Sequence, residues 1–347
     1  MPVRYCLGIQ NADVAGAIDP DKGPFKLDPL REQLLRLVPD LTFGDLLHVP
    51  SFAWTNKKLE TPHVMAQFRF EGHEEARRFH EHLKQRLPPP PDRKPIYGFG
   101  PDPPIHALEA WSPIGSGGGI FGSRDRAESL AGAAGLRDKY NQPVTGKGVN
   151  VVIADRGLCR SVVQATAARM AARRGLPEPA EQRVLGWTRY DRTGSLDDPR
   201  PRYINPGRYG SEHGYMIARN VLAVAPDAII WDAPLLPSDD EPDAPPGPSD
   251  AAQLFQFIMD ARKAGKITSW DFSVRKHVTV DFAGPVVLVN AWGVMDPEAD
   301  RDLADQQLKY ADNPENFLVN DVRRLEQQDI DIVFAAGNCG EPCPDPR

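Results

Sequence analysis

The stretch from Thr145 to Leu158, TGKGVNVVIADRGL, constrains the fold of this chain more than any other part of its sequence. It opens with a turn and continues into a run of valine and isoleucine that is too apolar for a strand with one solvated face. Such a run is typical of a strand buried on both sides of a parallel sheet. Asp155 stands at the carboxyl end of this strand, where ligands and catalytic groups gather in open α/β sheets. Taken alone, Asp155 is more simply interpreted as a cap for a helix that starts near Arg160.

Strands and helices alternate through the rest of the chain, which predicts an α/β fold with a parallel sheet and helices on both faces. The predicted strands are 149–154, 228–233, 286–291 and 330–336. The predicted helices are 123–140, 161–174, 213–224, 251–264 and a longer region over 300–328. We therefore assign residues 121–347 to one domain.

Residues 1–87 predict a separate, small α+β unit. Strands are expected at 4–10, 43–49 and 63–70, and helices at 27–38 and 73–87. The order β-α-β-β-α fits a ferredoxin-like sandwich. Residues 88–120 are rich in proline and glycine, and they predict a linker between the two domains.

Composition excludes several classes of partner. The formal net charge is -7, so neither nucleic acid nor an anionic membrane is expected to bind this chain. No apolar run approaches the ~20 residues that cross a bilayer, and the first residues lack the apolar core of a secretory signal. A cytoplasmic location fits these observations best. Cys339 and Cys343 form a C-x3-C pair that is a disulfide, half of a metal site or two plain thiols. No other cysteine or histidine pair has ligand spacing, so we expect neither metal nor cofactor.

Two further stretches carry polar residues at positions suited to catalysis. In GSEHGYMIARNVLAVAPDA, His213 stands at the start of a predicted helix. It is either a surface or capping residue, or an imidazole that an aspartate at a neighbouring strand end orients as a general base. In DIDIVFAAGN, Asn338 follows a predicted strand. It is either a turn residue or an amide donor for a developing oxyanion.

Together, these motifs resemble the subtilisin-like (subtilase) serine protease family. VNVVIADRG resembles the family's aspartate motif, HGYMIAR followed by VAPDA resembles its histidine motif, NAWG at 290–293 resembles its substrate strand, and AAGN resembles its asparagine motif. The resemblance implies that Asp155 orients the imidazole, that His213 is the general base and that Asn338 stabilises the oxyanion. It also implies that Ala291, Trp292 and Gly293 contact an extended protein or peptide substrate by strand pairing.

The chain departs from the family pattern at several points. Arg156 follows the aspartate where the family has a small hydroxyl residue, and Tyr215, Met216 and Arg219 alter the histidine motif. No Gly-Thr-Ser motif follows Asn338, so the resemblance implies a fragment whose nucleophile lies beyond it and which does not hydrolyse peptides by itself.

Two functions therefore remain open: a subtilase-type endopeptidase, or a catalytically dead module that binds peptides or regulates. A Rossmann-type nucleotide site is disfavoured because no G-x-G-x-x-G follows the first strand. The unit at 1–87 is either a propeptide that contacts the catalytic domain within the chain, or a domain that recruits a partner.

Overall fold

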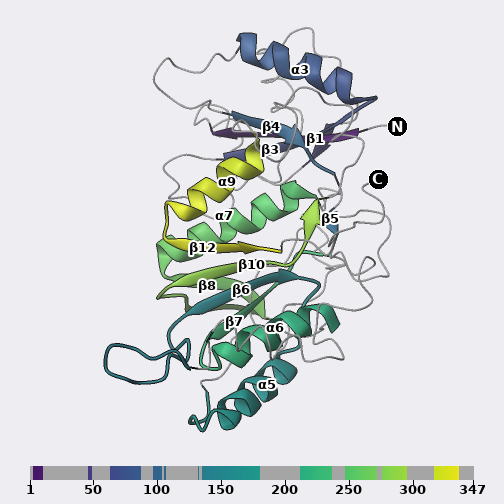
Figure 1. Cartoon of the computed structure of the whole chain (residues 1–347). Helices are drawn as coiled ribbons and strands as arrows, with labels where there is room; N and C mark the ends of the chain where they lie inside the picture. The colour runs from purple at the N-terminus through teal and green to yellow at the C-terminus, as the bar shows by residue number, and fades with distance from the viewer. Residues whose placement is uncertain are drawn as a thin grey trace.

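A computed structural model describes part of the chain, and the structural statements below concern those residues. They are residues 3–10, 46–48, 63–86, 97–103, 105–106, 132, 135–179, 212–236, 247–271, 276–294 and 316–335. They form a mixed α/β fold with two four-stranded sheets (Figure 1).

The amino-terminal sheet is antiparallel, with the strand order β2-β3-β1-β4. Its strands are β1 (Val3–Gln10), β2 (Leu46–His48), β3 (His63–Phe70) and β4 (Tyr97–Pro101). Helix α3 (His73–Arg86) covers one face. There Phe79 lies 5.1 Å, between ring centroids, from Phe68 and 5.2 Å from Phe99. Burial of these aromatic rings stabilises the unit by roughly 1.5–3 kcal/mol for each ring.

The second sheet is parallel, with the strand order β12-β10-β6-β7. Its strands are β6 (Asn150–Asp155), β7 (Ile229–Pro234), β10 (Val286–Asn290) and β12 (Ile330–Phe334). Helices α5 (Arg160–Arg173) and α6 (Glu212–Val224) contribute to the core on one face, and α7 (Pro248–Ala264) and α9 (Phe317–Glu326) to the core on the other. The predicted parallel sheet with helices on both faces is thus present.

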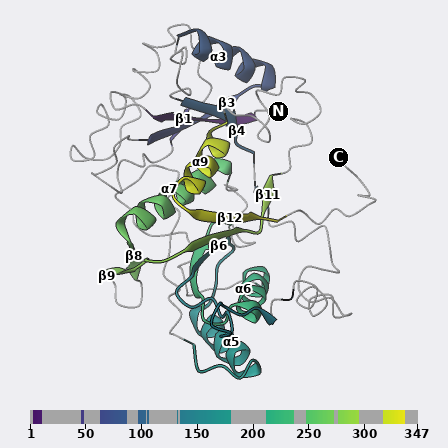
Figure 2. The same ribbon diagram turned by 60° about the vertical axis from the view of Figure 1, so that its left-hand side comes forward.

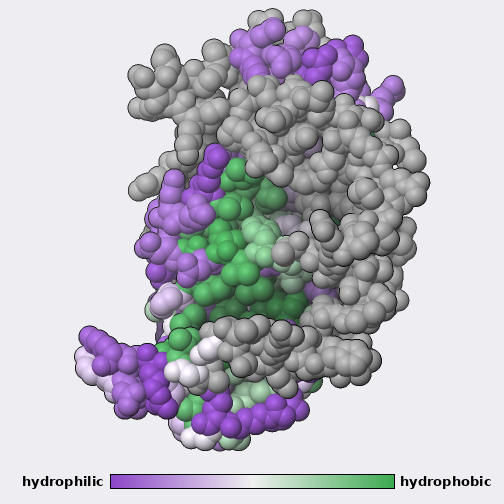
Figure 3. All heavy atoms as spheres, viewed as in Figure 1, coloured by the Kyte–Doolittle hydropathy of each residue, from purple (hydrophilic) through white to green (hydrophobic). Residues whose placement is uncertain are grey.

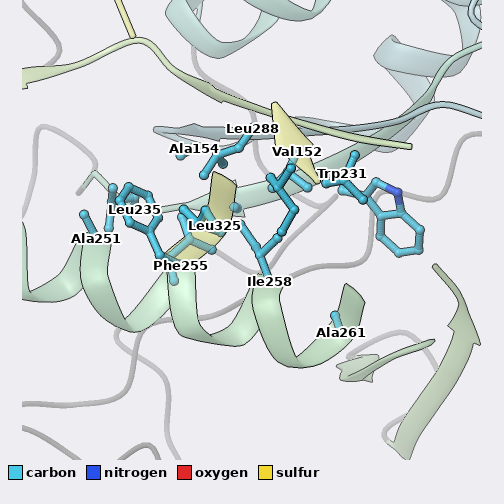
Figure 4. Packing of buried hydrophobic residues seen from close by; sticks show 14 of the residues in the cluster. Val152, Ala154, Trp231, Leu235, Ala251, Phe255, Ile258, Ala261, Leu288 and Leu325 are labelled. Carbon is cyan, nitrogen blue, oxygen red and sulfur yellow. The ribbon is translucent and has the colours of Figure 1, made fainter. Parts of the chain in front are cut away.

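Strand β6 explains why its sequence is apolar without alternation. Val151 and Ile153 belong to the core beneath α5 and α6, whereas Val152 and Ala154 belong to the core beneath α7 and α9. Every residue of the strand is buried. In the second core, Phe255 and Ile258 project from α7 toward the sheet that carries Val152 (Figure 4).

The elements stack in layers, with α3 at one end and α5 at the other (Figures 1 and 2). The amino-terminal sheet lies over α7 and α9, where Cys6 of β1 clusters with Ala252 of α7 and Phe317 of α9. Hydrophobic residues gather over the middle layers (Figure 3). Two large apolar side chains of β12, Val333 and Phe334, are 50% and 42% exposed.

The buried carboxylate of Asp102 links the amino-terminal sheet to helix α7. Asp102, just after β4, accepts hydrogen bonds from the backbone N–H and the hydroxyl of Ser249, at 2.8 and 2.9 Å, in the first turn of α7. It also forms an ion pair with Arg4 of β1, with 3.0 Å between Nε and Oδ2. A carboxylate suits this place because the N–H groups of a helix's first turn lack partners within the helix.

Two shorter pairings complete the fold. Strand β8 (Lys266–Asp271) pairs with β9 (Lys276–Asp281), and β5 (Ile105–His106) pairs antiparallel with β11 (Gly293–Val294).

The structure differs from the sequence prediction in the predicted linker and in one helix. The linker at 88–120 contains β4, which belongs to the amino-terminal sheet, and β5, which pairs with β11. The predicted helix at 123–140 is absent over 135–140, where Asp138 accepts hydrogen bonds from the backbone N–H groups of Tyr140 and Gln142. This aspartate turn competes with a helix for the same backbone groups. Residues 123–131 and the predicted helix at 27–38 lie outside the described residues.

Candidate active site

Asp155 and His213 form a buried pair at the carboxyl edge of the parallel sheet. The His213 Nδ1 atom lies 2.8 Å from Asp155 Oδ2 and 3.1 Å from Oδ1. The side chain of Asp155 is 1% exposed and that of His213 is 8% exposed. The two residues are 58 positions apart in the sequence. The sequence predicted that these side chains approach within hydrogen-bond distance, and the structure places them there.

Local structure holds both residues. Asp155 is the last residue of β6, and its Oδ1 accepts a hydrogen bond of 2.7 Å from the Arg156 backbone N–H. Gly157 then adopts a φ of 108°, which favours glycine and turns the chain toward α5. His213 is the second residue of α6, so its backbone is fixed by the helix.

This geometry determines which ring nitrogen can react. An ionised carboxylate only accepts hydrogen bonds, so beside ionised Asp155 the Nδ1 atom of His213 carries a proton. In the neutral ring, the Nε2 atom then holds the lone pair and can accept a proton from a nucleophile. The carboxylate also favours the imidazolium that would result. The pair can therefore act as a general base with its orienting acid.

The predicted peptide-contacting residues lie one strand away. Asn290, at the end of β10, is paired with Ala154 of β6, and Ala291, Trp292 and Gly293 follow it. The backbone of Gly293 pairs with His106 of β5. Trp292 is 2% exposed, so its ring lies within the core rather than along an open groove. Its ring meets Phe334 edge-on, at 5.6 Å between centroids.

The other predicted site residue, Asn338, lies outside the described residues, as do Cys339 and Cys343. The described residues contain no group of three or more side chains placed to share a metal ion. Among the described helices, none combines the length and the apolar character that a membrane span requires.

Tyr215, one of the departures from the subtilase motifs, forms hydrogen bonds with residues of α5. The hydroxyl of Tyr215 lies 3.2 Å from the Thr166 hydroxyl and 3.1 Å from Arg169 Nη2, both on α5. These hydrogen bonds lower the pKa of Tyr215, and the one with Thr166 has the larger effect. Tyr215 therefore links α6 to α5 by hydrogen bonds, two residues after His213.

Cys159 precedes α5, four residues after Asp155. Its Sγ atom lies 3.2 Å from the Ser161 hydroxyl. This hydrogen bond, together with the backbone N–H groups of Val162 and Ser161, lowers the pKa of the thiol, while partial burial opposes the effect. Only three residues separate Asp155 from Cys159, so a thiol of lowered pKa lies close in sequence to the orienting acid.

Sequence reasoning missed two participants in this region. Asn290 is fully buried, and neither polar atom of its amide has a hydrogen-bond partner among the residues that the structure describes. Its signal was a lone polar residue that ends the run VVLVN. Ile105 is 2% exposed and pairs with Val294, but it sits in a proline-rich stretch that gives no strand pattern.

The fold and site together define a mixed α/β protein with a carboxylate–imidazole pair at the edge of a parallel sheet. Comparison with protein-family models, with curated proteins and with solved structures found no match to this chain.

Proposed function

We propose that this chain carries the aspartate and histidine of a subtilase-type serine endopeptidase. Asp155 orients the imidazole, His213 accepts the proton of a serine, and Asn338 donates to the oxyanion. The proposal assigns roles to these three residues and names no residue as the nucleophilic serine.

The observation that carries the proposal is the 2.8 Å contact between His213 Nδ1 and a nearly inaccessible carboxylate. Burial of a lone aspartate costs several kcal/mol. Among the described residues, Asp155 pairs with His213 and with the Arg156 backbone N–H alone, which points to a function for the pair. The pair also lies at the carboxyl edge of the sheet, where catalytic groups of α/β proteins gather.

The amino-terminal sheet and the β5–β11 pairing support the proposal of a subtilisin-like fold. The amino-terminal sheet has the strand order of a ferredoxin-like sandwich and rests on two helices, α7 and α9, of the second domain. From it the chain continues to β5, which pairs with β11 beside the predicted peptide-contacting residues. We therefore assign the amino-terminal unit a propeptide-like role, with Ile105 and His106 occupying the strand that would bind a substrate.

The alternative is a peptide-binding module without catalysis. The observation that favours it is the β5–β11 pairing, because strand pairing requires only backbone groups and no nucleophile. Arg156, next to the orienting acid, also differs from the small residue of active subtilases.

Labelling with a fluorophosphonate separates the two functions. In the protein expressed from the complete reading frame, we expect a serine to be labelled, and we expect His213→Ala to abolish the labelling. His82→Ala, which alters an exposed histidine on α3, is the matched control and should label like the wild type. Labelling that persists in His213→Ala contradicts the proposed base, and a complete protein that is never labelled leaves the peptide-binding module.

A further inference from the structure

The hydroxyl oxygen of Tyr215 accepts two hydrogen bonds from helix α5. The Thr166 hydroxyl donates one over 3.2 Å, and Arg169 Nη2 donates the other over 3.1 Å. Thr166 is 2% exposed, so its hydroxyl needs a partner within the protein. Tyr215 is half-buried and Arg169 is exposed, so the contact reaches from the core to the surface between the two helices. Tyr215 is therefore held by a helix other than its own.

Tyr215 and His213 hold opposite sides of the first turn of α6. Successive residues of an α-helix are rotated by about 100°, so side chains two positions apart point in nearly opposite directions. The His213 side chain is bonded to Asp155 at the end of β6, and the Tyr215 side chain is bonded to α5. The two contacts therefore fix this turn both to the strand that carries the carboxylate and to the helix that follows that strand.

These polar contacts matter because the apolar packing of α6 begins further along the helix. The core that α5 and α6 share takes its members of α6 from Ile217 onward, including the fully buried Ala218 and Leu222. His213 precedes that packing. The first N–H groups of a helix have no partner within the helix, so its first turn opens more easily than its middle. Such an opening would carry the imidazole away from the carboxylate.

We propose that Tyr215 is a positioning residue for His213, because its contact with α5 holds the first turn of α6 and so keeps Nδ1 of the histidine on Asp155. This inference rests on the proposed function in treating His213 as the general base. A general base works only within hydrogen-bond reach of the proton that it takes, so a turn that opens part of the time lowers the fraction of competent protein. Tyr215 acts through His213 and is assigned no contact with substrate.

Proton exchange at His213 tests the proposal in the chain as it stands. With ¹⁵N-labelled histidine, NMR follows the rate at which the Nδ1 proton exchanges with water, and the resonance is assigned by its loss in His213→Ala. Tyr215→Phe removes the hydroxyl and keeps the ring. One hydrogen bond changes an equilibrium roughly twofold to tenfold, so we expect exchange to be about tenfold faster in Tyr215→Phe. Tyr140→Phe makes the same change at a tyrosine that is 71% exposed, and should exchange like the wild type.

Variants of α5 show whether the effect passes through the contact. Thr166→Val removes one donor with little change of shape and should speed the exchange about threefold, whereas Thr166→Ser keeps a hydroxyl and should exchange like the wild type. When Tyr215→Phe and Thr166→Val are combined, exchange should be no faster than in Tyr215→Phe alone, because the contact is already lost. Thr166→Val also carries the test if Tyr215→Phe does not fold.

The dependence of the exchange rate on urea separates positioning from general stability. Opening one helical turn exposes little surface, so the rate at His213 should barely change in dilute urea, whereas exchange through global unfolding rises steeply. A steep dependence in the wild type means that Tyr215 only stabilises the fold, and the proposal is then wrong. An unchanged rate in Tyr215→Phe overturns it as well. Fluorophosphonate labelling does not enter these measurements, so the positioning role and the proposed function can fail separately.

Discussion

Asp321 gives the chain a pH dependence that can be calculated from its surroundings. It lies on α9 between Phe317 and Leu325, on the buried stripe of the helix, and it is 0% exposed. Its Oδ1 accepts a hydrogen bond of 2.9 Å from Arg324, whose side chain is 24% exposed. Burial raises the pKa of Asp321 from the usual 3.8 to about 7, although Arg324 opposes the effect.

The sign follows from proton binding. Between pH 3.8 and about 7, Asp321 holds its proton in the folded chain and loses it in the unfolded chain. The folded state therefore binds more protons in this window, and the free energy of unfolding falls as the pH rises through it. Each pH unit corresponds to about 1.4 kcal/mol, so this group removes about 3 kcal/mol between pH 5 and pH 8.

The variant Asp321→Asn isolates this contribution because its amide is neutral at every pH. We expect the free energy of unfolding of the variant, relative to the wild type, to be about 3 kcal/mol higher at pH 8 than at pH 5. Urea unfolding at both pH values measures the difference, with tryptophan fluorescence as the signal. Asp331→Asn makes the same change at an exposed position of β12 and should show no such pH dependence.

Equal differences between wild type and Asp321→Asn at pH 5 and pH 8 would refute the reasoning. They would show that the carboxyl is already ionised at pH 5 despite its burial, or that the helix opens to admit water.

Three further predictions concern the joint between the sheets, a glycine turn and the candidate site. Asp102→Ala leaves Arg4, whose side chain is 16% exposed, and a helix N-terminus without their shared carboxylate, and should lower the free energy of unfolding in urea by about 3 kcal/mol; a loss below about 1 kcal/mol contradicts this. Gly284→Ala places a Cβ against the Gly148 carbonyl at a φ of +97°, and should lower the thermal midpoint measurably; an unchanged midpoint argues against the turn. In the complete protein, Asp155→Asn should slow fluorophosphonate labelling by about 10⁴-fold, because an amide does not hold the reactive tautomer of His213; labelling at the wild-type rate rules out the orienting role.

The sequence alone predicted the parallel sheet from its apolar strands, and β6, the strand with the clearest pattern, is buried along its whole length. Strands β6, β10 and β12 read as apolar runs, and the helices between them carry apolar residues at helical spacing. The order of Asp155 and His213 on successive elements also indicated that they meet, since the carboxyl ends of parallel strands share one edge.

The sequence failed where pairing depends on distant residues. Strands β4 and β5 lie in a proline-rich stretch, and they form because Tyr97–Pro101 completes the amino-terminal sheet and Ile105 pairs with Val294. The strand propensity of a short segment carries no information about such distant partners. The absence of a helix at 135–140 has the opposite cause, since the Asp138 side chain captures nearby backbone N–H groups.

What the sequence by itself determined is the class of fold and the residues that can meet at the sheet edge, because apolar patterns and the order of elements along the chain are both read directly from the sequence. Only the tertiary structure decided how the parts are joined. Asp102 reaches Ser249 across 147 positions, and among the described residues the amide of Asn290 and the indole N–H of Trp292 have no hydrogen-bond partner. Satisfaction of a buried polar group depends on every atom around it, and those atoms come together only when the whole chain has folded.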